Sequence, residues 1–199
     1  KDAANMICTG KCNQNPESAV GVLAMAGDRV QLVATPSPDQ GRILGGINSI
    51  KVTGVCNLIA GIKVGQLALK HRMNKNQRQR ICAFIASPIT ATIKELETLG
   101  KNLKKNNVSI DLISIGEVED NKEKIAKLHE AANSNGTSNI LEVEPGMSVL
   151  SNAVVSSTIM HPDGVPAAGG GGDGGFGGFG GMEENDPELA MALRWNKLQ

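Results

Sequence analysis

The last stretch of the sequence, EENDPELAMALRWNKLQ, combines a carboxylate cluster with the pattern of a short apolar helix. Asp186 is a suitable N-cap and Pro187 suits the first helical position, so we expect a helix to begin there. One stripe of this helix, at i, i+3, i+4 and i+7, contains Leu189, Ala192, Leu193 and Asn196. The acidic residues that precede or open it are Glu183, Glu184, Asp186 and Glu188. This pattern predicts binding to another protein, at a small apolar patch with a basic rim.

A glycine-rich run, residues 169–181, precedes this helix and predicts a flexible tether, because its few side chains cannot offset the backbone entropy lost on ordering. The alternative is a helix that packs back on its own domain through an adjacent face that contains Met191, Trp195 and Leu198. A glycine tether is a poor way to build a packed helix, so we favour capture of an outside partner. A helix of roughly a dozen residues is marginal alone in water, so we expect it to form fully on binding, with modest affinity.

The strongest local concentration of positive charge is KHRMNKNQRQR, residues 70–80. Its cationic or titratable side chains are Lys70, His71, Arg72, Lys75, Arg78 and Arg80. Such a run can bind phosphate groups, but it contains no aromatic residue on which a base could stack. It joins a predicted helix to a predicted strand, where a solvated loop is common. Of the functional interpretations, we favour a protein-docking face over a phosphate site.

No motif for catalysis or nucleotide binding occurs, since the sequence lacks a GxGxxG after its first strand, a Walker sequence and a nucleophile elbow. The histidines do not share a metal-ligand spacing; they are His71, His129 and His161. The acidic residues Glu117, Glu119 and Asp120 fit no cation-binding loop, and we expect a solvated turn there before the next helix. The sequence therefore predicts no enzyme, no catalytic residue and no cofactor.

The overall composition is typical of a protein of the cytoplasm and nucleus. Lys plus Arg equals Asp plus Glu at 20 each, so the net charge does not direct the chain to nucleic acid or to an anionic membrane. No window approaches the roughly 20 apolar residues of a membrane span, and no signal-peptide pattern is present. The cysteines have neither a CxxC nor a zinc spacing, and we expect reduced, buried thiols at Cys8, Cys12, Cys56 and Cys82.

Short β-prone runs alternate with helical ones before the tether. The expected strands cover residues 19–27 and 29–34, joined by a Gly27-Asp28 turn, and residues 80–87, 108–116 and 139–144. The expected helices cover residues 57–72, 92–107, 121–136 and 146–157, and Asn57 is a candidate cap for the first of them. Because the later strands are apolar on both faces and helices separate them, we predict a doubly wound, mostly parallel α/β sheet with helices on both faces. The predicted organisation is an α/β domain over 1–158, a flexible linker over 159–182 and a short helix within 183–199.

Three stretches of the domain resemble the von Willebrand factor A type domain of the proteasome regulatory-particle ubiquitin receptors: NPESAVGVLAMAG, LIAGIKVGQLALKHRMNKNQRQRICAFIASPI and LGKNLKKNNVSIDLISIGE. The C-terminal DPELAMALR resembles the ubiquitin-interacting motif of the same family. The resemblance implies a non-catalytic receptor that docks on proteasome subunits through its domain and captures ubiquitin chains with its tail. The implied ubiquitin contacts are Glu183, Glu184, Asp186, Glu188, Leu189, Ala190, Met191, Ala192, Leu193 and Asn196.

The resemblance also bears on metal binding, because many domains of this type hold Mg²⁺ with an Asp-x-Ser-x-Ser at the first strand, a later Thr and a further Asp. Here Ile59 stands where the Thr is expected, and Ser87 stands in place of the Asp. The first strand is missing, so we expect an N-terminally truncated domain with no bound metal. The strands near residues 20–25 and 81–86 are then expected to lack a partner. Either the sequence is a fragment of a longer chain, or the domain folds poorly and docks weakly.

The tail departs from the family motif at its far end. The motif usually has a Ser where Asn196 stands, followed by further acidic residues, whereas this sequence continues with Lys197, Leu198 and Gln199. Losing the fit of a hydroxyl typically costs about 1 kcal/mol or more, so we expect weakened ubiquitin binding. The alternative is an α/β scaffold that docks partners through residues 70–80 and carries a vestigial tail that no longer binds ubiquitin.

Overall fold

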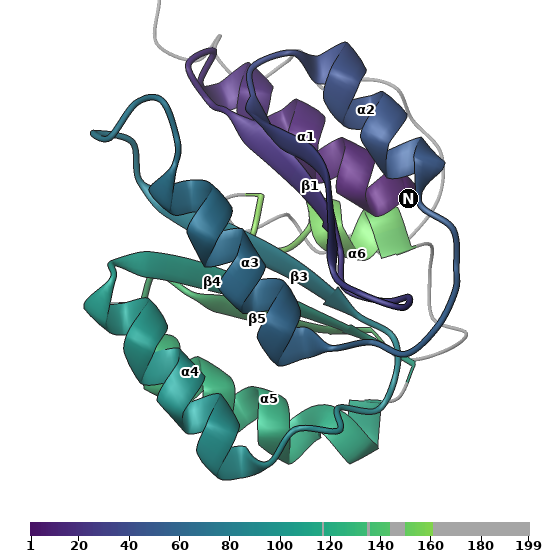
Figure 1. Cartoon of the computed structure of the whole chain (residues 1–199), viewed down its shortest axis with the longest axis vertical. Helices are drawn as coiled ribbons and strands as arrows, with labels where there is room; N and C mark the ends of the chain where they lie inside the picture. The colour runs from purple at the N-terminus through teal and green to yellow at the C-terminus, as the bar shows by residue number, and fades with distance from the viewer. Residues whose placement is uncertain (117, 135, 144–149, 161–199) are drawn as a thin grey trace, which may run out of the picture. The chain divides into compact units, whose positions relative to one another are not determined.

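Two separate β-sheets form the framework of the domain (Figure 1). The computed structural model describes residues 1–116, 118–134, 136–143 and 150–160, all within the first of the chain's two units, residues 1–167. An antiparallel pair consists of β1 (Val20–Ala24) and β2 (Gln31–Ser37), joined by a turn at Gly27. A parallel sheet in the order β3-β4-β5 consists of β3 (Gln79–Ile85), β4 (Val108–Ile115) and β5 (Asn139–Val143). The predicted α/β fold with a mainly parallel sheet and an early hairpin is confirmed. The expectation that the hairpin forms an antiparallel edge of that sheet is wrong, because β1 and β2 pair only with each other among the described residues.

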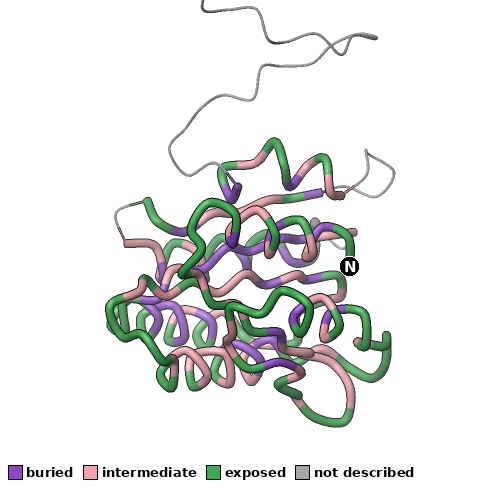
Figure 2. Tube along the Cα trace, turned by 90° about the horizontal axis from the view of Figure 1, so that it is seen from above, coloured by how far each residue is buried: buried purple, intermediate pink, exposed green. Residues whose placement is uncertain are grey.

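Helices cover both faces of the parallel sheet, each with an apolar side turned inward. The described helices are α1 (Asp2–Gln14), α2 (Gln40–Ser49), α3 (Leu58–Lys70), α4 (Ile93–Lys105), α5 (Val118–Ala132) and α6 (Leu150–Val155), of which α2 belongs to the hairpin. On one face, α3, α4 and α5 share a core with Ile110 and Leu112 of β4. On the opposite face, α1 and α6 share a core with Ile113. The hairpin packs against α2 around Val22 and Ala34. Figure 2 shows buried residues along the strands and the inner sides of helices, and exposed residues along the connecting loops.

The starts of three helices follow from their first residues. Asn57 caps α3, as predicted, because its Oδ1 accepts a hydrogen bond from the Ala60 amide at 3.0 Å. Thr92 and Glu95 form a capping box at the start of α4. The expected solvated turn at Glu117, Glu119 and Asp120 is wrong for the last two, which lie in the first turn of α5, and Glu117 is outside the described residues. Carboxylates are favoured at that position by the helix dipole, so this acidic segment begins the helix rather than preceding it.

Within the described residues, β1 and β3 each have one open edge. Hydrogen bonds pair β1 with β2 alone and β3 with β4 alone. These are the two strands for which the sequence predicts a missing neighbour. The link between the sheets runs through α3 instead, since Met25 packs on the core that includes Leu58 and Ile62, and the Asn57 amide donates to the Met25 carbonyl at 2.9 Å.

A buried carboxylate joins the three strands of the parallel sheet. Asp111 of β4 is 0% exposed, and its two oxygens accept hydrogen bonds from Nη1 of Arg80 at 2.9 and 2.6 Å. Nδ2 of Asn139, the first residue of β5, donates to the same carboxylate at 2.9 Å. Arg80 also donates from Nη2 to the Thr137 carbonyl at 3.2 Å. Because an unpaired buried charge is very unfavourable, these bonds are a condition for the burial of Asp111.

Gly100 marks a close crossing of α4 and α5. A Cβ atom at this position would lie 2.6 Å from the Cβ of Ala131 and 2.9 Å from the amide nitrogen of Ala132. Both atoms are fixed to the α5 backbone and cannot rotate away, so the crossing requires a residue without a side chain.

Replacing Arg80 by Met is expected to lower the free energy of unfolding by about 3–5 kcal/mol, because it leaves the Asp111 carboxylate buried without its cation. Much of this loss should return in the double variant Arg80→Met, Asp111→Leu, which removes both charges. Urea denaturation would measure both variants. Arg78→Met serves as the control, since Arg78 is exposed and forms no ion pair among the described residues, and should change stability by no more than about 0.5 kcal/mol. Equal losses in the single and double variants would contradict the role assigned to the pair.

Gly100→Ala is expected to destabilise the domain by about 1–3 kcal/mol through overpacking, although alanine is intrinsically the better helix former. Gly45→Ala is the matched control, because Gly45 is an exposed residue of α2 and a Cβ there would meet nothing within 4 Å. That substitution should stabilise the domain by about 0.5–1 kcal/mol. Thermal melts of the two variants would show opposite shifts, and a rise in stability for both would refute the close crossing.

Candidate functional site

The ten residues implied in ubiquitin binding lie outside the described part of the chain. They belong to the predicted tail helix and the acidic residues before it, from Glu183 to Asn196. Their helix, contact stripe and partner therefore stay predictions from the sequence.

The basic run of residues 70–80 consists of the last residue of α3, a loop of residues 71–78 and the first two residues of β3. Arg72 is held within the loop, donating from Nη1 to the Leu69 carbonyl at 3.0 Å and from Nη2 to the Lys75 carbonyl at 2.6 Å. Arg80 is held by Asp111. Arg80 is nevertheless exposed, and so are Lys70, His71, Lys75 and Arg78 of the predicted docking face. The structure thus places Lys70, His71, Lys75 and Arg78 at the end of α3 and on the loop that follows it, and gives Arg72 and Arg80 internal partners.

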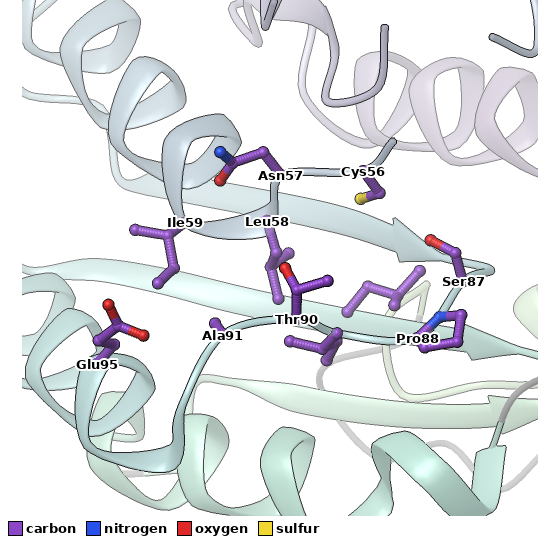
Figure 3. Close-up of a pocket in the computed structure, with 11 residues that line it drawn as sticks. Cys56, Asn57, Leu58, Ile59, Ser87, Pro88, Thr90, Ala91 and Glu95 are labelled. Atoms are coloured by element: carbon purple, nitrogen blue, oxygen red, sulfur yellow. The ribbon is translucent and has the colours of Figure 1, made fainter. Parts of the chain in front are cut away.

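A cavity of about 260 Å³ lies at the carboxyl end of β3 (Figure 3). Its walls come from residues 56–59, where α3 begins, and from the loop of residues 87–91 after β3, with Glu95 of α4 at its side. Ile59 and Ser87, which stand at the expected positions of metal ligands, both line it. Ligands of doubly wound sheets commonly bind at this end of the strands.

Side chains of α5 hold the loop of residues 87–91 in place through hydrogen bonds. Asn121 is 1% exposed; its Oδ1 accepts from the Ile89 amide at 2.8 Å and its Nδ2 donates to the Ser87 carbonyl at 3.0 Å. Nζ of Lys124 donates to the Ile89 carbonyl. The cavity wall is therefore preformed. A polar residue near a helix start is usually solvated, so the sequence carries no signal for this role of Asn121.

The lining of the cavity combines apolar side chains with the hydroxyls of Ser87 and Thr90, the Cys56 thiol, the Asn57 amide and the Glu95 carboxylate. Glu95 is the one carboxylate among the residues that line it, and its Oε2 accepts from the Thr92 amide at 2.9 Å and the Thr92 hydroxyl at 2.8 Å. These bonds hold the pKa of Glu95 below its usual range. The cap therefore stabilises the fold above the unfolded pKa of this carboxyl, and its contribution is lost as the pH falls through the folded pKa. Across the described ranges, no group of three or more His, Cys, Asp or Glu side chains is arranged to hold a metal.

The histidines and cysteines have structural surroundings. His71 follows the last turn of α3, and Nε2 of His129 lies 2.9 Å from the Ser138 carbonyl, whereas His161 is outside the described residues. All four cysteines are free thiols, as predicted, but only Cys12 is fully buried. Burial raises the pKa of Cys8 to about 11 and that of Cys82 to about 12, which keeps both protonated and unreactive near neutral pH.

Comparisons with known proteins agree on one family. Residues 1–87 match the model of the von Willebrand factor type A domain. The chain is 40% identical to the 26S proteasome regulatory subunit RPN10 of Saccharomyces cerevisiae, over 97% of this chain and 76% of that protein. It is 45% identical to the 26S proteasome non-ATPase regulatory subunit 4 homolog of Arabidopsis thaliana, over 97% of this chain and 52% of that protein. For the homolog of Oryza sativa subsp. japonica, the identity is 49% over 79% of this chain and 40% of that protein. The chain thus spans about half the length of these plant relatives.

Solved structures support the same assignment. The crystal structure of the SpRpn10 VWA domain matches with a TM-score of 0.74 and 39% identity, over 79% of this chain and 82% of that one. The conserved hypothetical protein BatB from Bacteroides thetaiotaomicron matches with a TM-score of 0.56 at 10% identity, which shows the fold alone. In the described residues, no helix has the length and apolar character required to cross a bilayer. The chain belongs to the Rpn10 family of 26S proteasome regulatory subunits, also named non-ATPase regulatory subunit 4, and its α/β domain is a von Willebrand factor type A domain.

Proposed function

We propose that this chain is a non-catalytic ubiquitin receptor of the proteasome regulatory particle, active in the cytoplasm and nucleus. The observation that carries the proposal is the extent of the similarity to RPN10. The match covers 97% of this chain, so it includes most of the tail as well as the domain. The domain and the tail therefore occur together in the relative, as they do here. Regulatory-particle subunits and polyubiquitin chains are the proposed partners, with no nucleic acid or membrane.

The two parts have different proposed roles. The domain docks on the regulatory particle, and its described cavity presents hydroxyls and apolar walls without a set of acid, base and nucleophile that would support catalysis. The tail captures ubiquitin through Leu189, Ala192 and Leu193, with the preceding carboxylates oriented toward a basic rim. The alternative, a docking scaffold with a vestigial tail, is favoured by one feature, the Asn196 in place of the usual Ser.

Titration of ¹⁵N-labelled ubiquitin with the full chain is expected to shift resonances around ubiquitin's apolar patch. Ala192→Arg should abolish these shifts because it fills the notch in the predicted stripe, whereas Arg194→Ala, on the opposite side of the helix, should leave them unchanged. Asn196→Ser should tighten binding about 5-fold, the equivalent of roughly 1 kcal/mol. Resonances that stay unmoved at millimolar chain would refute ubiquitin capture and leave the scaffold function.

Deletion of residues 169–199 separates the two roles. The truncated chain is expected to keep its association with purified regulatory particle and to lose retention of polyubiquitin chains on that particle. Loss of both associations would show that the domain does not dock independently of the tail.

A further inference from the structure

The fold brings a second basic segment beside the loop of residues 70–78. Helix α4 ends in the basic turn Lys104-Lys105, and β4 begins three residues later at Val108. Val108 is the register partner of Gln79, the first residue of β3, and Nε2 of Gln79 donates to the Asn106 carbonyl at 3.4 Å. Neighbouring strands lie about 5 Å apart, so Arg78 and Asn107, which directly precede this pair, are adjacent at the end of the sheet where β3 and β4 begin. Figure 1 shows α3 and α4 with their final turns at the same side of the molecule, where β3 and β4 begin.

Together these segments form a surface that we name the basic end. Its exposed side chains are Lys70, His71, Lys75 and Arg78 from the loop and Lys101, Lys104 and Lys105 from α4. No described residue forms an ion pair with any of them, although Nζ of Lys75 also donates to the Lys70 carbonyl. Two acidic residues lie near the basic end. Gln77 donates to the backbone carbonyl of Glu17, and Glu97 lies one turn before Lys101 in α4. The basic end therefore carries a strong local excess of positive charge on a chain of zero formal net charge.

Two apolar side chains are exposed at the same end. Met73 of the loop is 96% exposed, and Leu67 in the last turn of α3 is 55% exposed. A flexible methionine on an open surface is typical of sites that accommodate an apolar side chain of a partner. Surfaces that bind single-stranded nucleic acid instead stack bases on aromatic rings, and neither segment of the basic end contains one.

We propose that the basic end is a docking site for an acidic polypeptide segment of a partner protein, which places an apolar side chain against Met73. The cations attract and orient the segment, and the apolar contact selects among acidic sequences. The site is distinct from the tail and does not depend on ubiquitin capture.

Fluorescence anisotropy of the full chain with a short labelled peptide of glutamates and aspartates around a central leucine tests this proposal. Lys104→Glu with Lys105→Glu is expected to weaken binding about 10-fold or more. Lys51→Glu with Lys94→Glu changes the net charge equally at exposed positions elsewhere, Lys94 being near the opposite end of α4, and should weaken binding no more than about 2-fold. Urea denaturation of both variants would confirm that they are folded. Equal losses in the two charge variants would overturn the proposal, because only the overall charge would then matter.

The apolar contact is tested by a double-mutant cycle. Met73→Ser should weaken binding of the leucine peptide by about 3-fold to 10-fold and leave a peptide with serine in place of leucine unaffected. A single-stranded DNA oligonucleotide of equal charge is the competing probe. The proposal is overturned if Met73→Ser affects both peptides alike, or if the oligonucleotide binds as tightly as the leucine peptide and loses affinity with the same lysine substitutions.

Discussion

The hydrogen-bonded ion pair between Asp111 and Arg80 is the interaction on which the arrangement of the domain depends. Asp111 lies in the central strand and receives bonds from residues of both neighbouring strands, so it is satisfied only when β3, β4 and β5 have their observed register. A slip by one residue would turn Arg80 to the opposite face of the sheet and leave the carboxylate unpaired. The register in turn places the loops at the two ends of the strands. The cavity at one end and the basic end at the other are both consequences of this alignment.

The elements themselves are largely predictable because their signals are local. Continuous apolar runs predict β3, β4 and β5, and the cap at Asn57 predicts the start of α3. Asp111 is different: within VSIDLISIG it is one polar residue among apolar ones, and its partners are 31 and 28 positions away. Asn121 is hidden for the same reason, since its partners at Ser87 and Ile89 belong to a loop more than 30 residues earlier. Buried polar networks form between segments that are distant in the sequence. The hydrophobic periodicity of one segment predicts its secondary structure but does not identify such partners.

The basic end also combines features that are visible in the sequence with features that only the fold defines. A basic run between a helix and a strand is visible in the sequence, but the internal roles of Arg72 and Arg80 are not. The contribution of α4 to the same surface depends on the pairing of Gln79 with Val108, which only the folded sheet defines. The tail could be interpreted further from sequence because its signals, a cap, a proline and a stripe, all lie within a dozen residues.

The position of α3 between the two sheets affects how strain spreads through the domain. Backbone hydrogen bonds fix two paired strands in one register, whereas elements joined by side-chain packing can shift slightly when a side-chain volume changes. Within the described residues, the hairpin meets the parallel sheet through α3 and its neighbours rather than through a ladder between β1 and β3. A change of side-chain volume at Ile62, which packs in the shared core, would therefore displace one sheet against the other. The same change at Leu103, between α4 and the parallel sheet, would shift α4 and leave the hairpin in place. Helix α3 thus couples the hairpin to the parallel sheet on one side of that sheet. Helix α1 does so on the other side, since Ile7 packs in the core with Ile113 and Cys8 packs against the hairpin core.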